Sequence, residues 1–106
     1  MKKEYQGLEL VDNAYDQQFE VVVDGLTAFV EYELRQHLLT LVHTEVPAAL
    51  EGQGLGSALV EKVLHHASER HLTIIPQCPF VASYLQQHPD WYRLVAPGYR
   101  PTDVPS

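Results

Sequence analysis

Three glycines alternate within the segment Glu51–Ser57, which reads Glu-Gly-Gln-Gly-Leu-Gly-Ser. The segment follows a strand-like run at 38–46 and precedes a helix-like run at 55–70. A turn with few Cβ atoms at the start of a helix can aim several backbone N–H groups at one point, and these groups and the helix dipole favour an anion. We therefore predict a phosphate or pyrophosphate site here, and the alternative interpretation is an ordinary glycine-rich turn.

Two familiar phosphate-binding motifs do not fit the segment. A dinucleotide-binding fingerprint has a third glycine three residues after the second, but Ser57 and Leu59 occupy the two positions where it would fall. A P-loop has a lysine directly after its last glycine, whereas Lys62 is the first lysine after the loop. The ligand is therefore expected to belong to another class of phosphate-containing molecule.

The segment resembles the acyl-CoA pyrophosphate loop of the Gcn5-related N-acetyltransferases, whose pattern is Gln/Arg-x-x-Gly-x-Gly/Ala. Gly54 and Gly56 match this pattern, and Glu51 departs from it by replacing the opening Gln or Arg. Two further blocks, His43–Pro47 and Cys78–Val81 with the later pair His88-Pro89, are similar to the small, single-domain YjdJ-type branch of the superfamily. The resemblance covers roughly residues 8 to 95.

The resemblance implies an acetyl-CoA-dependent N-acetyltransferase in which an amine attacks the thioester directly. The alternative is a non-catalytic acyl-CoA-binding or regulatory module, which the short chain and Glu51 favour. A third class, a protein-interaction domain without a ligand, has little support from the motifs. The residues expected to contact the cofactor are Val46, Gln53, Gly54, Leu55, Gly56, Ser57 and Cys78.

Three residues are candidates for proton transfer. His43 and Glu45 alternate along a strand-like run, so their side chains share one face. The resemblance makes that run, 38–46, and the run 72–75 the two strands that splay apart to receive the pantetheine arm, so either group can accept the proton of an attacking amine. Tyr84 occupies the helix on which many such enzymes keep a tyrosine as general acid. A hydrogen-bonded histidine, a solvated glutamate and a core tyrosine are the competing interpretations.

Cys78 directly precedes Pro79, so it is expected to be the N-cap residue of a helix. In the YjdJ-type branch a cysteine at this point lies near the acetyl thioester. It is either a nucleophile, which requires a neighbouring base, or a wall of the channel. A buried structural cysteine is the competing interpretation. We predict that Cys78 lines the acyl end and is not required for chemistry.

The spacing of apolar residues changes half-way along the chain, from a period typical of strands to one typical of a helix. Strand-like runs at 8–11, 19–23, 26–34 and 38–46 are joined by turn signals, of which Asp24-Gly25 is the clearest. A helical stripe at 55–70, an apolar strand at 72–75 expected to be buried on both faces, a helix at 79–87 and a last strand at 92–95 follow. The pattern predicts one compact α+β domain, residues 1–106, with antiparallel strands, then a βαβ unit and a further helix, as in the acetyltransferase fold. The core is expected at about 8–95, with a loose tail from Ala96.

The composition narrows the class of partner. Residues 1–51 hold ten acidic and three basic side chains, and residues 52–106 hold four of each, so the net charge of −7 lies entirely before Gly52. An acidic surface argues against nucleic acid and favours a cationic acceptor of polyamine or lysine type, unless the acids serve only solubility. A membrane is not expected as a partner, since no run of about 18 apolar residues is present. The apparent lack of a signal peptide and the single cysteine favour a cytoplasmic location, and the oligomeric state is left open.

The six histidines do not form a recognisable metal motif. His65 and His66 are adjacent and point apart on a helix, and no pair has the spacing of four that places two histidines on one helix face. We therefore predict no metal site.

Overall fold

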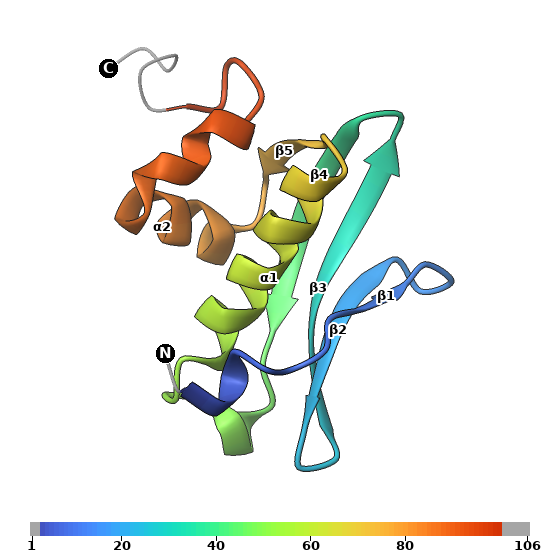
Figure 1. Ribbon diagram of the computed structural model, residues 1–106, viewed down its shortest axis with the longest axis vertical. Helices are drawn as coiled ribbons and strands as arrows, with labels where there is room; N and C mark the ends of the chain where they lie inside the picture. The colour runs from blue at the N-terminus through green and yellow to red at the C-terminus, as the bar shows by residue number, and fades with distance from the viewer. Residues whose placement is uncertain (1–2, 101–106) are drawn as a thin grey trace.

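A computed structural model describes residues 3–100 and shows one five-stranded sheet with two helices packed on one of its faces (Figure 1). The strands run in the spatial order β1-β2-β3-β4-β5. Their bounds are β1 (Val11–Asn13), β2 (Gln18–Val23), β3 (Leu26–Arg35), β4 (Leu38–Glu45) and β5 (Thr73–Pro76). The helices are α1 (Leu55–Glu69) and α2 (Pro79–Gln87), and short 3-10 turns occupy Lys3–Tyr5, Ala48–Leu50 and Pro89–Leu94. This arrangement confirms the predicted α+β class.

The first four strands form the predicted antiparallel meander. Asp24 and Gly25 have φ angles of 53° and 76°, the left-handed values that a two-residue hairpin requires, so local turn chemistry sets the β2–β3 register. The strand predicted at 8–11 instead begins at Val11. Leu8 and Leu10 pack, half-buried, against the core rather than pairing with a neighbour.

The second half forms the predicted crossover. β4, α1 and β5 make a βαβ unit in which β5 pairs in parallel with residues 38–41 of β4. The apolar stripe of α1, which includes Leu59, Val63 and Ala67, is fully buried against the sheet. β5 is less buried than predicted. Only Ile74 is fully enclosed, because β5 lies at the edge of the sheet and not in its interior.

The C-terminal region differs from the sequence prediction at one element. α2 has the predicted bounds, but the strand predicted at 92–95 is wrong: Pro89–Leu94 is a 3-10 helix, and only Val95 forms an isolated bridge with Ile74. Pro89 at the first position favours the helical turn. The tail that was predicted to be loose from Ala96 is hydrogen-bonded at its start, where the Ala96 N–H donates to the Ile74 carbonyl. Residues 101–106 of the tail lie outside the described part of the chain.

A bulge interrupts the pairing of β3 with β4. Glu31 pairs with His43, but the next residue, Tyr32, pairs with Leu41, so Val42 is an extra residue without a partner. A bulge shifts the alternation of the strand by one residue, and every side chain beyond it changes face. This shift decides which β4 side chains face the helices.

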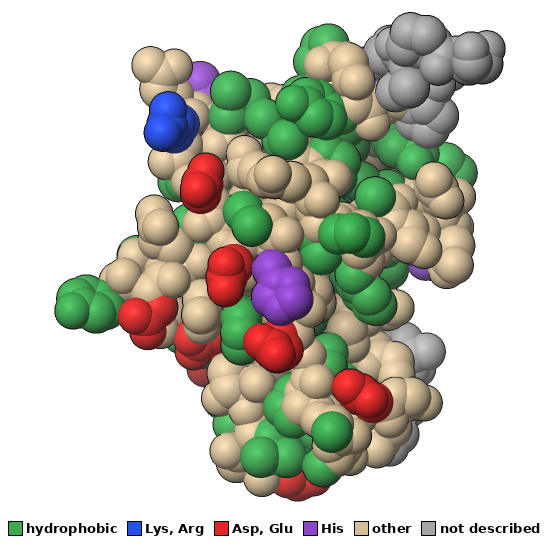
Figure 2. Space-filling model, turned by 180° about the vertical axis from the view of Figure 1, so that it is seen from behind, with side chains coloured by type: hydrophobic (Ala, Val, Ile, Leu, Met, Phe, Trp, Pro, Cys, Tyr) green, Lys and Arg blue, Asp and Glu red, His purple; other side chains and the backbone are tan. Residues whose placement is uncertain are grey.

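The two faces of the sheet differ in cover. α1 and α2 lie on one face, as Figure 1 shows. In residues 3–100 no helix of the structure covers the other face, where acidic side chains gather (Figure 2). They include Glu20, Glu31, Glu33 and Glu45. Among residues 3–100, no helix is long and apolar enough to cross a membrane.

Candidate functional site

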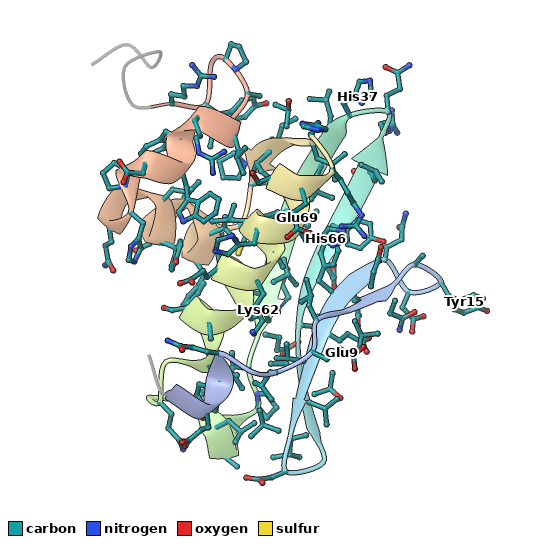
Figure 3. All side chains as sticks on the ribbon, in the orientation of Figure 1. Glu9, Tyr15, His37, Lys62, His66 and Glu69 are labelled. Atoms are coloured by element: carbon teal, nitrogen blue, oxygen red, sulfur yellow. The ribbon has the colours of Figure 1, made fainter. Side chains whose placement is uncertain are left out.

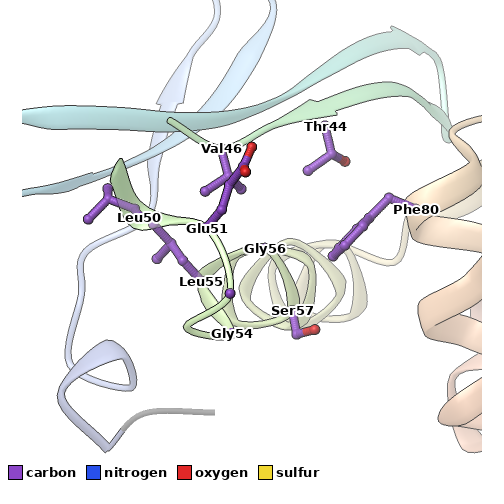
Figure 4. A pocket seen from close by; sticks show the side chains of 10 residues that line it. Thr44, Val46, Leu50, Glu51, Gly54, Leu55, Gly56, Ser57 and Phe80 are labelled. Carbon is purple, nitrogen blue, oxygen red and sulfur yellow. The ribbon is translucent and has the colours of Figure 1, made fainter. Parts of the chain in front are cut away.

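A hollow of about 400 Å³ lies between the end of β4, the glycine segment and the start of α2 (Figure 4). The residues that line it come from all three elements. They are Thr44, Val46, Leu50, Glu51, Gly52, Gly54, Leu55, Gly56, Ser57 and Phe80. Five of the seven residues predicted to contact a cofactor therefore share this hollow, and Gln53 and Cys78 do not line it.

The glycine segment places the start of α1 beside this hollow. Gly52 and Gly54 have φ angles of 78° and 84°, a left-handed conformation that side chains with a Cβ rarely adopt. Gly54 is the N-cap of α1 and supplies no side-chain cap. The Ala58 N–H donates to the Gly54 carbonyl at 3.0 Å, so the amides of residues 55–57 precede the first helical hydrogen bond. These amides can bind an anion.

The charges around the hollow differ from those of a typical phosphate site. No lysine or arginine of residues 3–100 lines it, and the carboxylate of Glu51 is part of its wall. Gln53 turns toward the N-terminal segment, where its side-chain oxygen accepts a hydrogen bond of 3.1 Å from the Tyr5 hydroxyl. An anion here depends on backbone N–H groups and on the Ser57 hydroxyl.

The β4 bulge determines the lining of the hollow. Before the bulge, Leu41 faces the helices and is buried. Beyond the bulge, Thr44 and Val46 occupy the same face of the strand and line the hollow. His43 and Glu45 consequently project to the uncovered face. Their side chains are 55% and 61% exposed, and Nε2 of the histidine lies 3.7 Å from Oε2 of the glutamate. The predicted pair is thus together, but on the other side of β4 from the glycine segment.

β4 has a free edge beside the hollow. β5 pairs only with residues 38–41, and the chain then turns away into α2, with the Cys78 N–H donating to the Leu41 carbonyl at 2.8 Å. Residues 43–45 of β4 are therefore paired with β3 alone. A group placed at this free edge is close to both faces of the strand.

Cys78 lies behind the lining of the hollow. It is the N-cap of α2, as predicted, and its side chain is buried with 2% exposed. Its Sγ lies 3.4 Å from Oγ1 of Thr44, which does line the hollow. His43 points to the opposite face of β4, so the geometry does not pair it with the thiol as a base.

Tyr84 lies on α2, next to a second and smaller hollow. This hollow of about 160 Å³ is lined by Ser57, Phe80, Ser83, Tyr84 and Gln87. The Tyr84 hydroxyl donates to Oε2 of Glu61 at 3.2 Å, and its ring stacks on His88 at 4.2 Å. Burial, and then the charge of Glu61 and the hydrogen bond to it, raise the pKa of Tyr84 to about 12. The phenol therefore stays protonated near neutral pH.

Comparison with known proteins decides the family. The model of the GCN5-related N-acetyl-transferase family matches residues 18–95. The chain belongs to this family. It is also similar in structure to a GCN5-like candidate N-acetyltransferase from Staphylococcus aureus, determined by NMR in solution, with 27% identity and a TM-score of 0.65. The match covers 84% of this chain and 88% of the other.

The GCN5-related match confirms the family and the fold predicted from the three motif blocks. Neither comparison names the YjdJ-type branch, which stays a prediction. Sequence reasoning missed three lining residues that lie outside the glycine segment: Thr44, Leu50 and Phe80. Thr44 was missed because the bulge was not foreseen, and Phe80 because the motif was read on its neighbours Cys78 and Pro79. No group of three or more His, Cys, Asp or Glu in residues 3–100 is arranged to hold a metal.

Proposed function

We propose that this protein transfers the acetyl group of acetyl-CoA to an amine by direct attack on the thioester. The observation that carries the proposal is the hollow itself. It joins the uncapped amides at the start of α1 to the free edge of β4, in a chain of the GCN5-related family. One end of the hollow suits a pyrophosphate. The other end reaches the free edge of β4, whose backbone groups can form hydrogen bonds with an extended pantetheine arm.

In this proposal the amides of residues 55–57 bind the pyrophosphate, with the Ser57 hydroxyl as a further donor. The pantetheine arm then runs past Val46 toward Thr44. A backbone N–H near residues 45–46 polarises the thioester carbonyl, because a fixed donor stabilises the negative charge that develops on this oxygen. Glu51 must point away from the pyrophosphate or face a cation, since two like charges repel.

The amine approaches from the uncovered face of the sheet. An amine must lose its proton before or during attack, and His43 and Glu45 are the titratable pair on that face, on the same strand that borders the hollow. The thioester at the free edge of β4 is within reach of both faces. This arrangement separates the cofactor side of β4 from the acceptor side.

Tyr84 stabilises the leaving thiolate in this mechanism. An ordinary tyrosine has a pKa of about 10 and an ordinary thiol one of about 8.5. Burial, the largest cause of the raised Tyr84 pKa, makes this phenol a weaker acid still. Complete proton transfer is therefore unfavourable, and the hydroxyl acts as a hydrogen-bond donor to the thiolate. To do so it must leave Glu61.

A non-catalytic acyl-CoA-binding module is the second candidate. The carboxylate of Glu51 in the wall of the hollow and the absence of lining lysine or arginine within residues 3–100 favour it. Release of free CoA thiol from acetyl-CoA, measured with a panel of amines, separates the two functions. Amine-dependent release supports the enzyme, and CoA binding by calorimetry without any release supports the module.

The acceptor is expected to carry a second positive charge, as polyamines and lysine side chains in basic segments do. Glu20, Glu31, Glu33 and Glu45 share the uncovered face with His43, so their field attracts a cation to it. We expect kcat/KM to be about tenfold higher for 1,4-diaminobutane than for 4-aminobutan-1-ol at low salt. The ratio should shrink toward one as added salt screens the field.

The double variant Glu31→Gln/Glu33→Gln should reduce this preference. Glu69→Gln/Asp90→Asn is a matched control, because it removes the same charge from residues outside the strands of the acidic face. Equal kcat/KM values for the two amines at every salt concentration would show that the acidic face does not select the acceptor.

Cys78→Ala is expected to keep acetyl transfer within about tenfold of the wild-type rate, since the thiol is shielded behind Thr44 and the candidate base His43 faces the other side of β4. Loss of the buried sulfur should cost about 1 kcal/mol of unfolding free energy. Activity and chemical denaturation measure the two effects. An acetylated Cys78 in the intact protein by mass spectrometry, together with an inactive alanine variant, would contradict direct transfer.

A further inference from the structure

Phe80 occupies an unusual place for an exposed aromatic residue. It is the second residue of α2, and 43% of its surface is exposed. Its ring nevertheless lies directly against the first turn of α1, as Figure 4 shows. A Cβ placed on Gly56 would be 2.7 Å from Cζ of this ring and 3.2 Å from Cε1. The ring therefore rests on glycine backbone, in space that any other residue at position 56 would enter.

The ring lies between two hollows. Ser57 and Phe80 line both the main hollow of about 400 Å³ and the smaller one of about 160 Å³. The main hollow contains the glycine segment, and the smaller one contains Tyr84 and Gln87 of α2. Without the ring, these two spaces would form one groove from the glycine segment along the start of α1 to α2.

A long ligand needs this continuity. Pockets for drug-sized ligands have volumes of about 300–1,000 Å³, and an acyl-CoA is larger than such a ligand, so the main hollow holds only part of it. Tyr84 is also separated from the main hollow in the present arrangement. Movement of one partly exposed side chain would extend the groove and bring the tyrosine into it. No backbone change is required, since a side chain at the start of a helix can rotate toward solvent.

We infer that Phe80 is a positioning residue that closes the groove in the free protein and leaves Gly56 when acyl-CoA binds. The inference rests on the proposed cofactor. The open arrangement is a minor state of the free protein, and the cofactor selects it because only that state offers the complete groove. Displacement of the ring places Tyr84 in the same space as the glycine segment.

Proton NMR tests the inference directly. In the free protein we expect nuclear Overhauser contacts between the Phe80 ring and the Gly56 Hα atoms. These contacts should disappear as CoA is added, while those between the stacked core rings of Phe19 and Tyr32 persist. Phe80–Gly56 contacts that persist in protein saturated with CoA would overturn the inference and leave the proposed cofactor intact. Failure to bind CoA by calorimetry would refute the proposed function, and the inference with it.

Removal of the ring provides a second test. Phe80→Ala should bind CoA up to about tenfold more tightly, because a minor state populated to about a tenth no longer has to be selected. Tyr15→Ala is the matched control, since it removes an aromatic ring that is 96% exposed on a turn outside both hollows. Unchanged or weaker CoA binding by Phe80→Ala, with Tyr15→Ala like the wild type, would show that the ring is a fixed wall.

Discussion

Gly56→Val is expected to weaken CoA binding by about 100-fold. The valine side chain would enter the space beside the first-turn amides of α1, where the Phe80 ring lies in the free protein, and would hold the pyrophosphate away from those amides. A hydrogen bond to a charged group contributes about 1.5–3 kcal/mol, and each 1.4 kcal/mol is a factor of ten in affinity. Loss of one or two such bonds gives the expected change, which calorimetry with CoA measures.

Gly7→Val is the matched control for this substitution. A Cβ at Gly7 meets no atom within 4 Å, so the same change of residue should leave CoA affinity unaltered there. Gly54→Val should also weaken binding, but through the backbone, because a β-branched residue is strained at a φ of 84°. A folded Gly56→Val protein that binds CoA as the wild type does would place the cofactor elsewhere.

His43→Gln is expected to lower kcat/KM for the amine by about 100-fold at pH 7, the lower end of the range for a general base. An amine of lysine type has a pKa of about 10.4 and is almost entirely protonated at pH 7, so its reaction depends on a base. The defect should shrink as the pH approaches 10, because the neutral amine then becomes abundant without help. A pH profile of kcat/KM for the wild type and the variant measures this.

His37→Gln is the control for the histidine substitution, since His37 lies in the turn between β3 and β4, at the far end of the strand from the hollow. Figure 3 shows its position at the end of the sheet. It should have wild-type activity at every pH. A His43→Gln enzyme whose rate is reduced equally at all pH values would assign His43 a structural role, and an unchanged rate would leave Glu45 as the candidate base.

Features that depend on local chemistry could be predicted from the sequence. The Asp24-Gly25 hairpin follows from the two residues that tolerate positive φ, and the bounds of α2 follow from Pro79 at its start and Pro89 after its end. The crossover from β4 through α1 to β5 follows from the spacing of apolar residues, which changes from the strand period to the helix period after β4. The family follows from motif blocks whose residues lie close together along the chain.

Features that depend on the register between strands could not be predicted. The extra residue Val42 has no signal of its own, since a valine suits a regular strand as well as a bulge. The bulge nevertheless decides that Thr44 faces the hollow while His43 and Glu45 face the other side. The contact of Phe80 with Gly56 joins two helices in space and has no counterpart in the local sequence.

The most direct test of the proposed function is the identity of the product. The protein is incubated with acetyl-CoA and 1,4-diaminobutane, free thiol is measured by absorbance, and the amine is analysed by mass spectrometry in parallel. The proposal predicts an amine heavier by one acetyl group that forms in equal amount to free CoA and only with the enzyme present. Thiol release without acetylated amine, or no release with any amine while CoA still binds, would contradict direct acetyl transfer.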